Sequence, residues 1–286
     1  MIKQSKNLFT GKKISTVLAL STLLGTSLFA DDNLVLDYEK KRVSQNPNIK
    51  IKDIKINTKK ELPIAGWTGY ILDIDAVIQG KDIKAKDFLF TNGTHIAPEL
   101  IDIKTMQSLK DSIVPNLTDK YYTKANFIAG NEKAKNKVVL FSDPLCPFCM
   151  DYIPTVINEV NKNKENIALY YYAFPLTQIH PASLPLSKII DIAHTKGVAD
   201  VITKAYTTDW SKYFDEKTTD EAKILAAFNK ELGTDIKIEE LNKKEINSKI
   251  EKDMTMGDEV MVSGTPTIYV NGVKESPKFN FDTLGK

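Results

Sequence analysis

The sequence predicts an α/β protein in two parts, a small α+β unit followed by a larger domain with a helical insertion. Three observations support this prediction. An apolar β-type run at residues 138–141 leads through a Ser-Asp-Pro turn into Cys-Pro-Phe-Cys at residues 146–149, where helical spacing begins. A second apolar run at residues 167–174 makes the order strand, helix, strand, which predicts a parallel right-handed crossover. Asn-Gly pairs at residues 92–93 and 271–272 stand between β-type runs and predict two hairpins.

The first thirty residues have the pattern of an export signal. Four lysines precede an apolar stretch at residues 14–24, and the small residue Ala30 stands before two aspartates. The apolar stretch is shorter than the roughly 18 residues that a transmembrane helix needs. We therefore predict a signal peptide at residues 1–30, cleaved after Ala30, and an exported, soluble mature chain. An uncleaved membrane anchor is the alternative.

Charge and cysteine content exclude several classes of protein. The chain has 39 Lys and Arg against 37 Asp and Glu, a net charge of +2, and removing the four signal lysines leaves +2 − 4 = −2. This charge gives no reason to expect a nucleic-acid partner. Both cysteines of the chain stand in one C-x-x-C, which excludes a scaffold held together by disulfides. We expect this pair to serve chemistry.

Residues 31–98 are expected to form the α+β unit. A helix is predicted from Asp32 to Ser44, with Leu34, Tyr38 and Val43 on its apolar side, and Asn-Pro-Asn then ends it. Three β-type runs follow, at residues 49–56, 71–78 and 87–91. Nothing in this unit resembles a catalytic motif.

Residues 99–120 are polar and carry only a sparse apolar stripe. We predict a linker helix here between the two domains, because its apolar content is low for a core element. A surface helix packed on one domain is the alternative. Pro115 is expected to end or kink it.

Residues 121–286 are predicted to form the catalytic domain. A short strand near residues 125–129 precedes the C-x-x-C strand, and the helix after the cysteines is expected to kink, not end, at Pro154. A helical insertion is predicted at about residues 184–260, and the strand Thr267–Val270 then opens the last hairpin.

The C-x-x-C has the layout of a redox centre. The first cysteine, Cys146, is expected at the N-cap of the helix, with Pro147 at the first helical position, where proline is tolerated. Free backbone N–H groups and the positive end of the helix dipole favour thiolate over thiol there. Cys149, one turn later, is placed to attack a mixed disulfide formed at Cys146.

Several motifs then indicate a family. The segment Phe141–Cys149 closely resembles the active site of the DsbC/DsbG branch of periplasmic thiol:disulfide interchange proteins, in the thioredoxin superfamily. Gly264-Thr265-Pro266-Thr267 is similar to their cis-proline loop. Three weaker likenesses extend over the rest of the chain. Phe174-Pro175 and His180-Pro181 are similar to the corresponding segments of DsbA-type and DsbG-type chains. The N-terminal unit, with Gly66-Trp67, resembles the dimerisation domain of DsbC and DsbG.

The resemblance implies a thioredoxin fold and a role for each matched residue. Cys146 would be the attacking and attacked thiol, and Cys149 would resolve the mixed disulfide. Pro266 would be cis and face the cysteine pair, with Thr265 offering backbone hydrogen bonds to an extended substrate. Pro147 and Phe148 would tune how far the thiolate is stabilised, and therefore the reduction potential.

The chain departs from thioredoxin at one position. Thioredoxin and DsbA carry a buried acid six residues before the first cysteine, and this chain has Leu140 there. Asp143 stands three residues before Cys146 instead, as in DsbC and DsbG. A redox-tuning role for Asp143 and a simple turn cap are both open.

Other readings of the cysteines and histidines are weaker. A structural zinc site needs four ligands. His95, His180 and His194 do not stand at the spacings from the cysteines that are typical of zinc ligands. A purely structural Cys146–Cys149 bridge would restrict the unfolded chain little. We predict no metal and no cofactor beyond the cysteine pair.

The predicted function is thiol:disulfide exchange on cysteines of unfolded or misoxidised exported proteins. A homodimeric, DsbC/DsbG-like isomerase or reductase is favoured, with an inner-membrane redox partner of the DsbD or DsbB type. A DsbA-like dithiol oxidase is one alternative. A holdase chaperone with a secondary redox role is the other.

Overall fold

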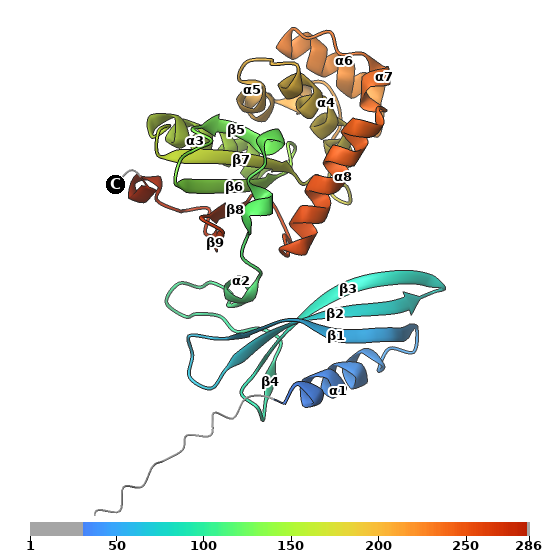
Figure 1. Ribbon diagram of the computed structural model, residues 1–286. Coiled ribbons are helices and arrows are strands. Elements are labelled where there is room, and N and C mark those ends of the chain that lie inside the picture. The colour runs from blue at the N-terminus through green and yellow to red at the C-terminus, as the bar shows by residue number, and fades with distance from the viewer. Residues whose placement is uncertain (1–30, 285–286) are drawn as a thin grey trace, which may run out of the picture.

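The structure is a computed structural model that describes residues 31–284 (Figure 1). The predicted signal peptide at residues 1–30 lies outside the described residues. Two sheets organise the chain, one of four strands near its beginning and one of five strands in its second part. Within residues 31–284, no helix is long and apolar enough to cross a lipid bilayer.

The first part is an antiparallel sheet with one helix on its face. The strands lie in the order β1-β2-β3-β4. Val35 of the helix packs among Tyr70, Leu72 and Ile74. Tyr38 and Leu34, predicted to face the sheet, are exposed instead, because the helix turns its Val35 and Glu39 side inward. The elements are α1 (Asp32–Val43), β1 (Ile49–Glu61), β2 (Thr68–Ile78), β3 (Lys81–Thr91) and β4 (Ile96–Ala97).

The hairpins of this sheet differ from the prediction in one respect. Asn92-Gly93 does turn the chain between β3 and β4, but the loop is wider than two residues, and the Asn92 side chain accepts hydrogen bonds from the backbone of Thr94 and His95. The tight two-residue turn lies between β2 and β3, where Gln79 and Gly80 both have positive φ. No Asn or Asp marks that turn, so the sequence pattern missed it.

The predicted linker helix at residues 99–120 is wrong. Only α2 (Lys110–Ile113) is helical there, followed by the short 3-10 helix η1 (Asp119–Tyr121). The Asp102 carboxylate accepts from the backbone N–H groups of Lys104 and Thr105, which offers the chain a turn in place of a helix. The segment is instead a connection that folds back on itself.

The second part is a mixed five-stranded sheet with helices, in strand order β5-β7-β6-β8-β9. Strands β6 and β7 are parallel, as predicted, and β5 and β8 flank them antiparallel. At the closing hairpin Asn271 and Gly272 both have positive φ, as a two-residue turn requires. The elements are η2 (Lys124–Asn126), β5 (Phe127–Gly130), β6 (Asn136–Ser142), α3 (Pro147–Lys162), β7 (Ile167–Ala173), β8 (Thr267–Val270), β9 (Val273–Glu275) and η4 (Phe281–Leu284).

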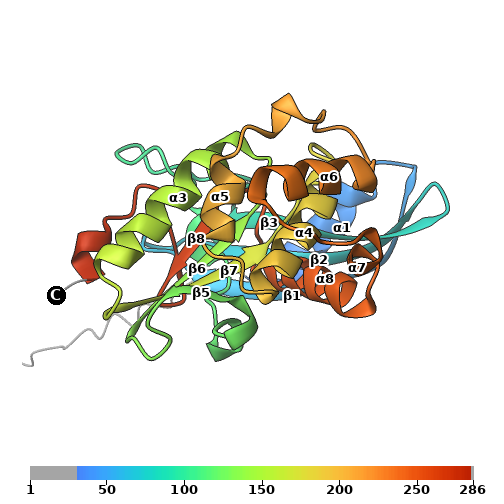
Figure 2. The ribbon, with the colours of Figure 1, turned by 90° about the horizontal axis from the view of Figure 1, so that it is seen from above.

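A block of helices joins β7 to β8. In Figures 1 and 2 it lies at one end of the five-stranded sheet, beside α3. Helix α3 itself continues through Pro154 for 16 residues. The block consists of α4 (Ser183–Thr195), α5 (Val201–Thr207), η3 (Trp210–Lys212), α6 (Glu221–Leu232), α7 (Ile238–Leu241) and α8 (Lys244–Glu259).

The two parts of the chain meet through a small apolar cluster. Met261, just after α8, packs with Ile71 and Phe90 of the first sheet and with Ile113 of α2. Figure 1 shows the first sheet below the second part, with α1 on the side away from it. The contact lies two residues before the loop at residues 263–266.

Candidate active site

Strand β6 delivers the cysteine pair to the end of the sheet. It lies between β7 and β8, and its residues from Val138 to Ser142 are buried. The turn after it brings Cys146 to the N-cap of α3, with Pro147 as the first helical residue. The backbone carbonyl of Cys146 accepts from the N–H groups of Cys149 and Met150, which starts the helix. Both cysteines are free thiols in this structure.

The Cys146 thiol is strongly acidified. A hydrogen bond from the Cys149 thiol is the largest cause, and the backbone N–H groups of Cys149 and Phe148 and the Thr265 side chain add to it. Together they outweigh the opposing effect of burial and lower the pKa of Cys146 from 9.0 to about 5. Cys146 is therefore a thiolate at neutral pH, although only 5% of its surface is exposed.

The Cys149 thiol behaves in the opposite way. It is fully buried, and burial raises its pKa far above the usual range. Its hydrogen bond to Cys146 adds to this, while Ser142, Thr265 and the backbone N–H of Asp143 act against it. The pair thus consists of one ionised sulfur near the surface and one protonated sulfur behind it.

The loop before β8 faces this pair. The Thr265–Pro266 peptide bond is cis, and the Thr265 carbonyl oxygen lies 3.3 Å from Cys146 Sγ, from which it accepts a hydrogen bond when Cys146 is protonated. The Thr265 hydroxyl is buried and has no hydrogen-bond partner among residues 31–284 while both sulfurs are thiols. It becomes a donor when a neighbouring sulfur ionises, and accordingly it lowers the pKa of both cysteines.

Asp143 holds the turn between β6 and α3. It is fully buried, and its two oxygens accept from the backbone N–H of Leu145 at 2.7 Å and of Leu176 at 2.8 Å. Its Oδ2 also lies 3.1 Å from Nδ1 of His180. Asp143 thus ties the cysteine turn to the segment after β7.

Sequence reasoning assigned no role to His180, which the structure places in this site. Its ring is buried against Asp143, and Nε2 lies 3.8 Å from the exposed carboxylate of Glu216. The His180-Pro181 pair, noted for its likeness to DsbA-type and DsbG-type chains, was the signal that pointed to it. His95 and His194 lie away from the cysteines, in the loop before β4 and at the end of α4.

Comparison with known proteins gives the family. A family model described as thioredoxin matches residues 122–286. The chain belongs to the thioredoxin family. It is 30% identical over 173 residues to a "Probable disulfide bond formation protein D" of Bacillus anthracis, covering 55% of this chain and 74% of that protein. The protein of the same name from Bacillus cereus is 28% identical over 173 residues, with the same coverage.

Solved structures also resemble the chain. The oxidised form of BdbD from Bacillus subtilis is 21% identical, covers 59% of this chain and 89% of its own, and has a TM-score of 0.44. The chain carries Cys-Pro-Phe-Cys at the start of α3. Together with the family match and the relatives named for disulfide bond formation, this makes it a thiol:disulfide oxidoreductase. The family match begins at residue 122, so it does not reach the four-stranded sheet.

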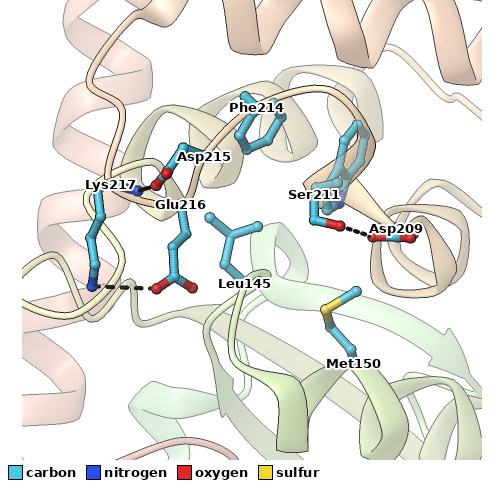
Figure 3. A pocket seen from close by; sticks show the side chains of 9 residues that line it. Leu145, Met150, Asp209, Ser211, Phe214, Asp215, Glu216 and Lys217 are labelled. Atoms are coloured by element: carbon cyan, nitrogen blue, oxygen red, sulfur yellow. Dashed lines mark hydrogen bonds and ion pairs between the residues drawn. The ribbon is translucent and has the colours of Figure 1, made fainter.

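The surface of the thioredoxin domain around Cys146 combines exposed apolar side chains with a hollow. Phe148, between the cysteines, is 76% exposed, and Pro147 beside it is exposed as well. Leu145 and Met150 line a pocket of about 570 Å³ together with residues from η3 and the segment after it (Figure 3). Its far side carries Asp209, Asp215, Glu216 and Lys217. The pocket gives room for a chain segment next to Cys146.

No metal site accompanies the pair. Within the described part of the chain, no three His, Cys, Asp or Glu side chains stand close enough to hold a metal ion.

Proposed function

We propose that this protein is a DsbC/DsbG-like thiol:disulfide interchange protein that isomerises or reduces disulfides in exported proteins. The observation that carries the proposal is the placement of the four-stranded sheet. It is joined to the thioredoxin domain at Met261, beside the loop of Thr265 and Pro266. An added domain at that position enlarges the surface on which a misfolded client can lie while its disulfide is exchanged.

The reaction begins at Cys146. Its thiolate attacks one sulfur of a client disulfide, a bond forms between Cys146 and the client, and the other client sulfur leaves as a thiolate. In isomerisation that thiolate attacks elsewhere in the client, and the final attack returns Cys146. In reduction, Cys149 attacks the mixed disulfide, and the oxidised pair then needs an electron donor, for which we propose a membrane partner of the DsbD type.

Two pockets that border the segment at residues 258–267 support client binding there. One, of about 410 Å³, is lined by residues 263–267 together with Gln107 and Lys274. The other, of about 620 Å³, lies between the first sheet and residues 258–263. Both border the loop at residues 263–266, so we propose that an extended client segment lies along this loop.

A dithiol oxidase is the second candidate, and one observation favours it. Stabilising the Cys146 thiolate stabilises the reduced form, which makes the disulfide form a stronger oxidant. The relatives named for disulfide bond formation are consistent with this direction. A DsbB-type partner would then recharge the pair.

We propose export to the periplasm, from the predicted signal peptide, and a homodimer held by the first sheet and α1. Leu34 and Tyr38 support the dimer, because they lie one turn apart on α1 and are 61% and 41% exposed. We propose that these two side chains form part of the surface that a second copy of the chain covers.

Refolding of ribonuclease separates the two directions. An isomerase restores activity to scrambled ribonuclease when the protein is added reduced in catalytic amounts, and Cys146→Ser abolishes the effect. An oxidase leaves scrambled ribonuclease inactive but, added oxidised, restores activity to the reduced form. Reactivation only in the second assay would overturn the isomerase proposal, and equal protection by Cys146→Ser in an aggregation assay would indicate a holdase instead.

A further inference from the structure

A line of buried hydroxyl groups leads away from Cys149. The Ser142 side chain stands beside the Cys149 thiol and acts to lower its pKa, against the larger effect of burial. Ser142 Oγ accepts from the Tyr206 hydroxyl at 2.8 Å, and the Tyr206 hydroxyl lies 3.0 Å from that of Tyr171. These residues come from three elements, β6, α5 and β7, and both hydrogen bonds are buried.

The line ends at a small cavity. Tyr171 lines a space of about 20 Å³ with Asp191 of α4 and Asp253 of α8. That volume holds about one water molecule. Ser187 also lines it, and its buried hydroxyl has no hydrogen-bond partner in the described residues. A polar group in the cavity would supply that partner.

Cys149 needs a route for its proton. It attacks the mixed disulfide as a thiolate, yet its sulfur is fully buried. Leu140 stands where a buried acid would serve in thioredoxin. Asp143 cannot serve as that acid, because its oxygens are engaged by two backbone N–H groups and His180, and it faces Cys149 with its backbone N–H.

We propose that Ser142, Tyr206 and Tyr171 form a hydroxyl relay that carries the proton of Cys149 to the cavity between β7, α4 and α8. The relay rests on the proposed thiol:disulfide exchange and adds the residues through which Cys149 is activated. Ser142 is the member that touches the reacting sulfur, and the two tyrosines act through it.

In the resting structure the Tyr206 hydroxyl points at Ser142 Oγ, so it first turns to donate to the Tyr171 hydroxyl. Cys149 then transfers its proton to Ser142 Oγ, each hydroxyl passes its own proton to the next, and Tyr171 delivers one to the cavity. The Cys149 sulfur then bonds to Cys146 and the bond between Cys146 and the client breaks. The client sulfur leaves with the electron pair and takes a proton from solvent.

Charged groups surround the relay on all sides. Asp143 faces it from the cysteine turn, and Asp253 with its partner Lys249 faces it from α8. Asp191 and His194 line the cavity from α4. Asp191 and Asp253 both line the cavity with Tyr171, and burial raises the pKa of each carboxyl group. The Asp253 carboxylate is paired with Lys249 at 2.5 Å, whereas Asp191 lies 4.0 Å from that lysine, so we assign Asp191 as the proton acceptor.

The test follows the two sulfurs separately. Reduced protein is mixed with equimolar dithiobis(nitrobenzoate) in a stopped-flow instrument. Attack by Cys146 releases the first thionitrobenzoate, and attack by Cys149 on the mixed disulfide releases the second. Tyr206→Phe and Tyr171→Phe each remove one hydroxyl from the relay. Tyr172→Phe is the matched control, since its buried hydroxyl bonds the Tyr121 carbonyl on the other face of β7.

We expect both relay variants to slow the second release about tenfold or more at neutral pH, a usual size for a lost proton-transfer path. The first release stays unchanged, and the second recovers as the pH rises. The proposal is overturned if Tyr206→Phe matches Tyr172→Phe in the second phase, or if both phases slow together. A wild type that releases no second thionitrobenzoate would overturn the exchange function itself, which keeps the two failures apart.

Discussion

The Sγ atom of Cys146 lies 3.3 Å from the carbonyl oxygen of Thr265, 119 residues later in the chain. This contact joins the N-cap of α3 to the loop before β8. The whole helical block lies between these residues in sequence, yet the sheet brings them together because β6 and β8 are paired. Two segments of the chain therefore fix the position of the reactive sulfur.

The first prediction concerns the ionisation of Cys146. Its alkylation by iodoacetamide should follow an apparent pKa near 5, far below the ordinary 9.0. Cys149→Ala should raise this pKa, because it removes the largest acidifying hydrogen bond, whereas Cys149→Ser keeps a donor and should raise it less. An unshifted pKa in Cys149→Ala would show that the helix terminus alone acidifies the sulfur.

The second prediction is the pH dependence of stability. The folded pKa of Cys146 is depressed, so the thiolate stabilises the reduced form fully above the unfolded pKa near 9.0, and this contribution is lost as the pH falls through about 5. The melting temperature of the reduced protein minus that of the oxidised protein should therefore rise with pH over this window. A flat difference would contradict the stabilised thiolate.

The third prediction concerns the Thr265 hydroxyl. Thr265→Val keeps the side-chain shape and removes a donor that lowers the pKa of Cys146. The pKa of Cys146 should rise. Below about pH 5, where both sulfurs are protonated, the free energy of unfolding should not fall, because the hydroxyl has no partner among the described residues. Thiol alkylation and urea unfolding measure the two quantities. A large loss of stability would mean that the hydroxyl is engaged in the folded protein.

The fourth prediction concerns Asp143. Asp143→Ala leaves the N–H groups of Leu145 and Leu176 without their acceptor in a buried turn. Unfolding free energy should fall by about 2–4 kcal/mol in urea titrations, in the range for buried polar groups left unpaired. Asp82→Ala, which removes an exposed partner of Lys52, is the control and should change little.

The fifth prediction sets two opposing effects against each other at Gly257. Replacing glycine by alanine inside a helix normally stabilises by about 1 kcal/mol. At Gly257 the added carbon would lie 2.6 Å from the Phe174 ring, so overpacking of about 1–3 kcal/mol should prevail. Gly264→Ala, where nothing lies within 4 Å, is the control. Thermal unfolding decides the sign.

The catalytic half of the fold was largely readable from sequence. The apolar runs of β6 and β7 are buried on both faces, and the Asn271-Gly272 turn has the expected geometry, so local pattern and tertiary structure agree there. Helix α1 was placed correctly, but its buried side was not. Leu34 and Tyr38 are exposed although they are apolar, because the sheet accepts the side that carries Val35.

The parts that could not be predicted depend on side chains meeting across the fold. The contact of Asp143 with His180 joins residues 37 apart, and the hydrogen bond of Tyr206 to Ser142 joins residues 64 apart. Neither spacing carries a local signal. The linker failed as a helix prediction for a local reason, since Asp102 bonds the backbone ahead of it.

The contact at Met261 has a mechanical consequence. Met261 packs against Ile71, Phe90 and Ile113, and only three residues separate it from Thr265. A displacement of the first sheet relative to the thioredoxin domain would therefore also move the Thr265 carbonyl oxygen relative to the Cys146 sulfur.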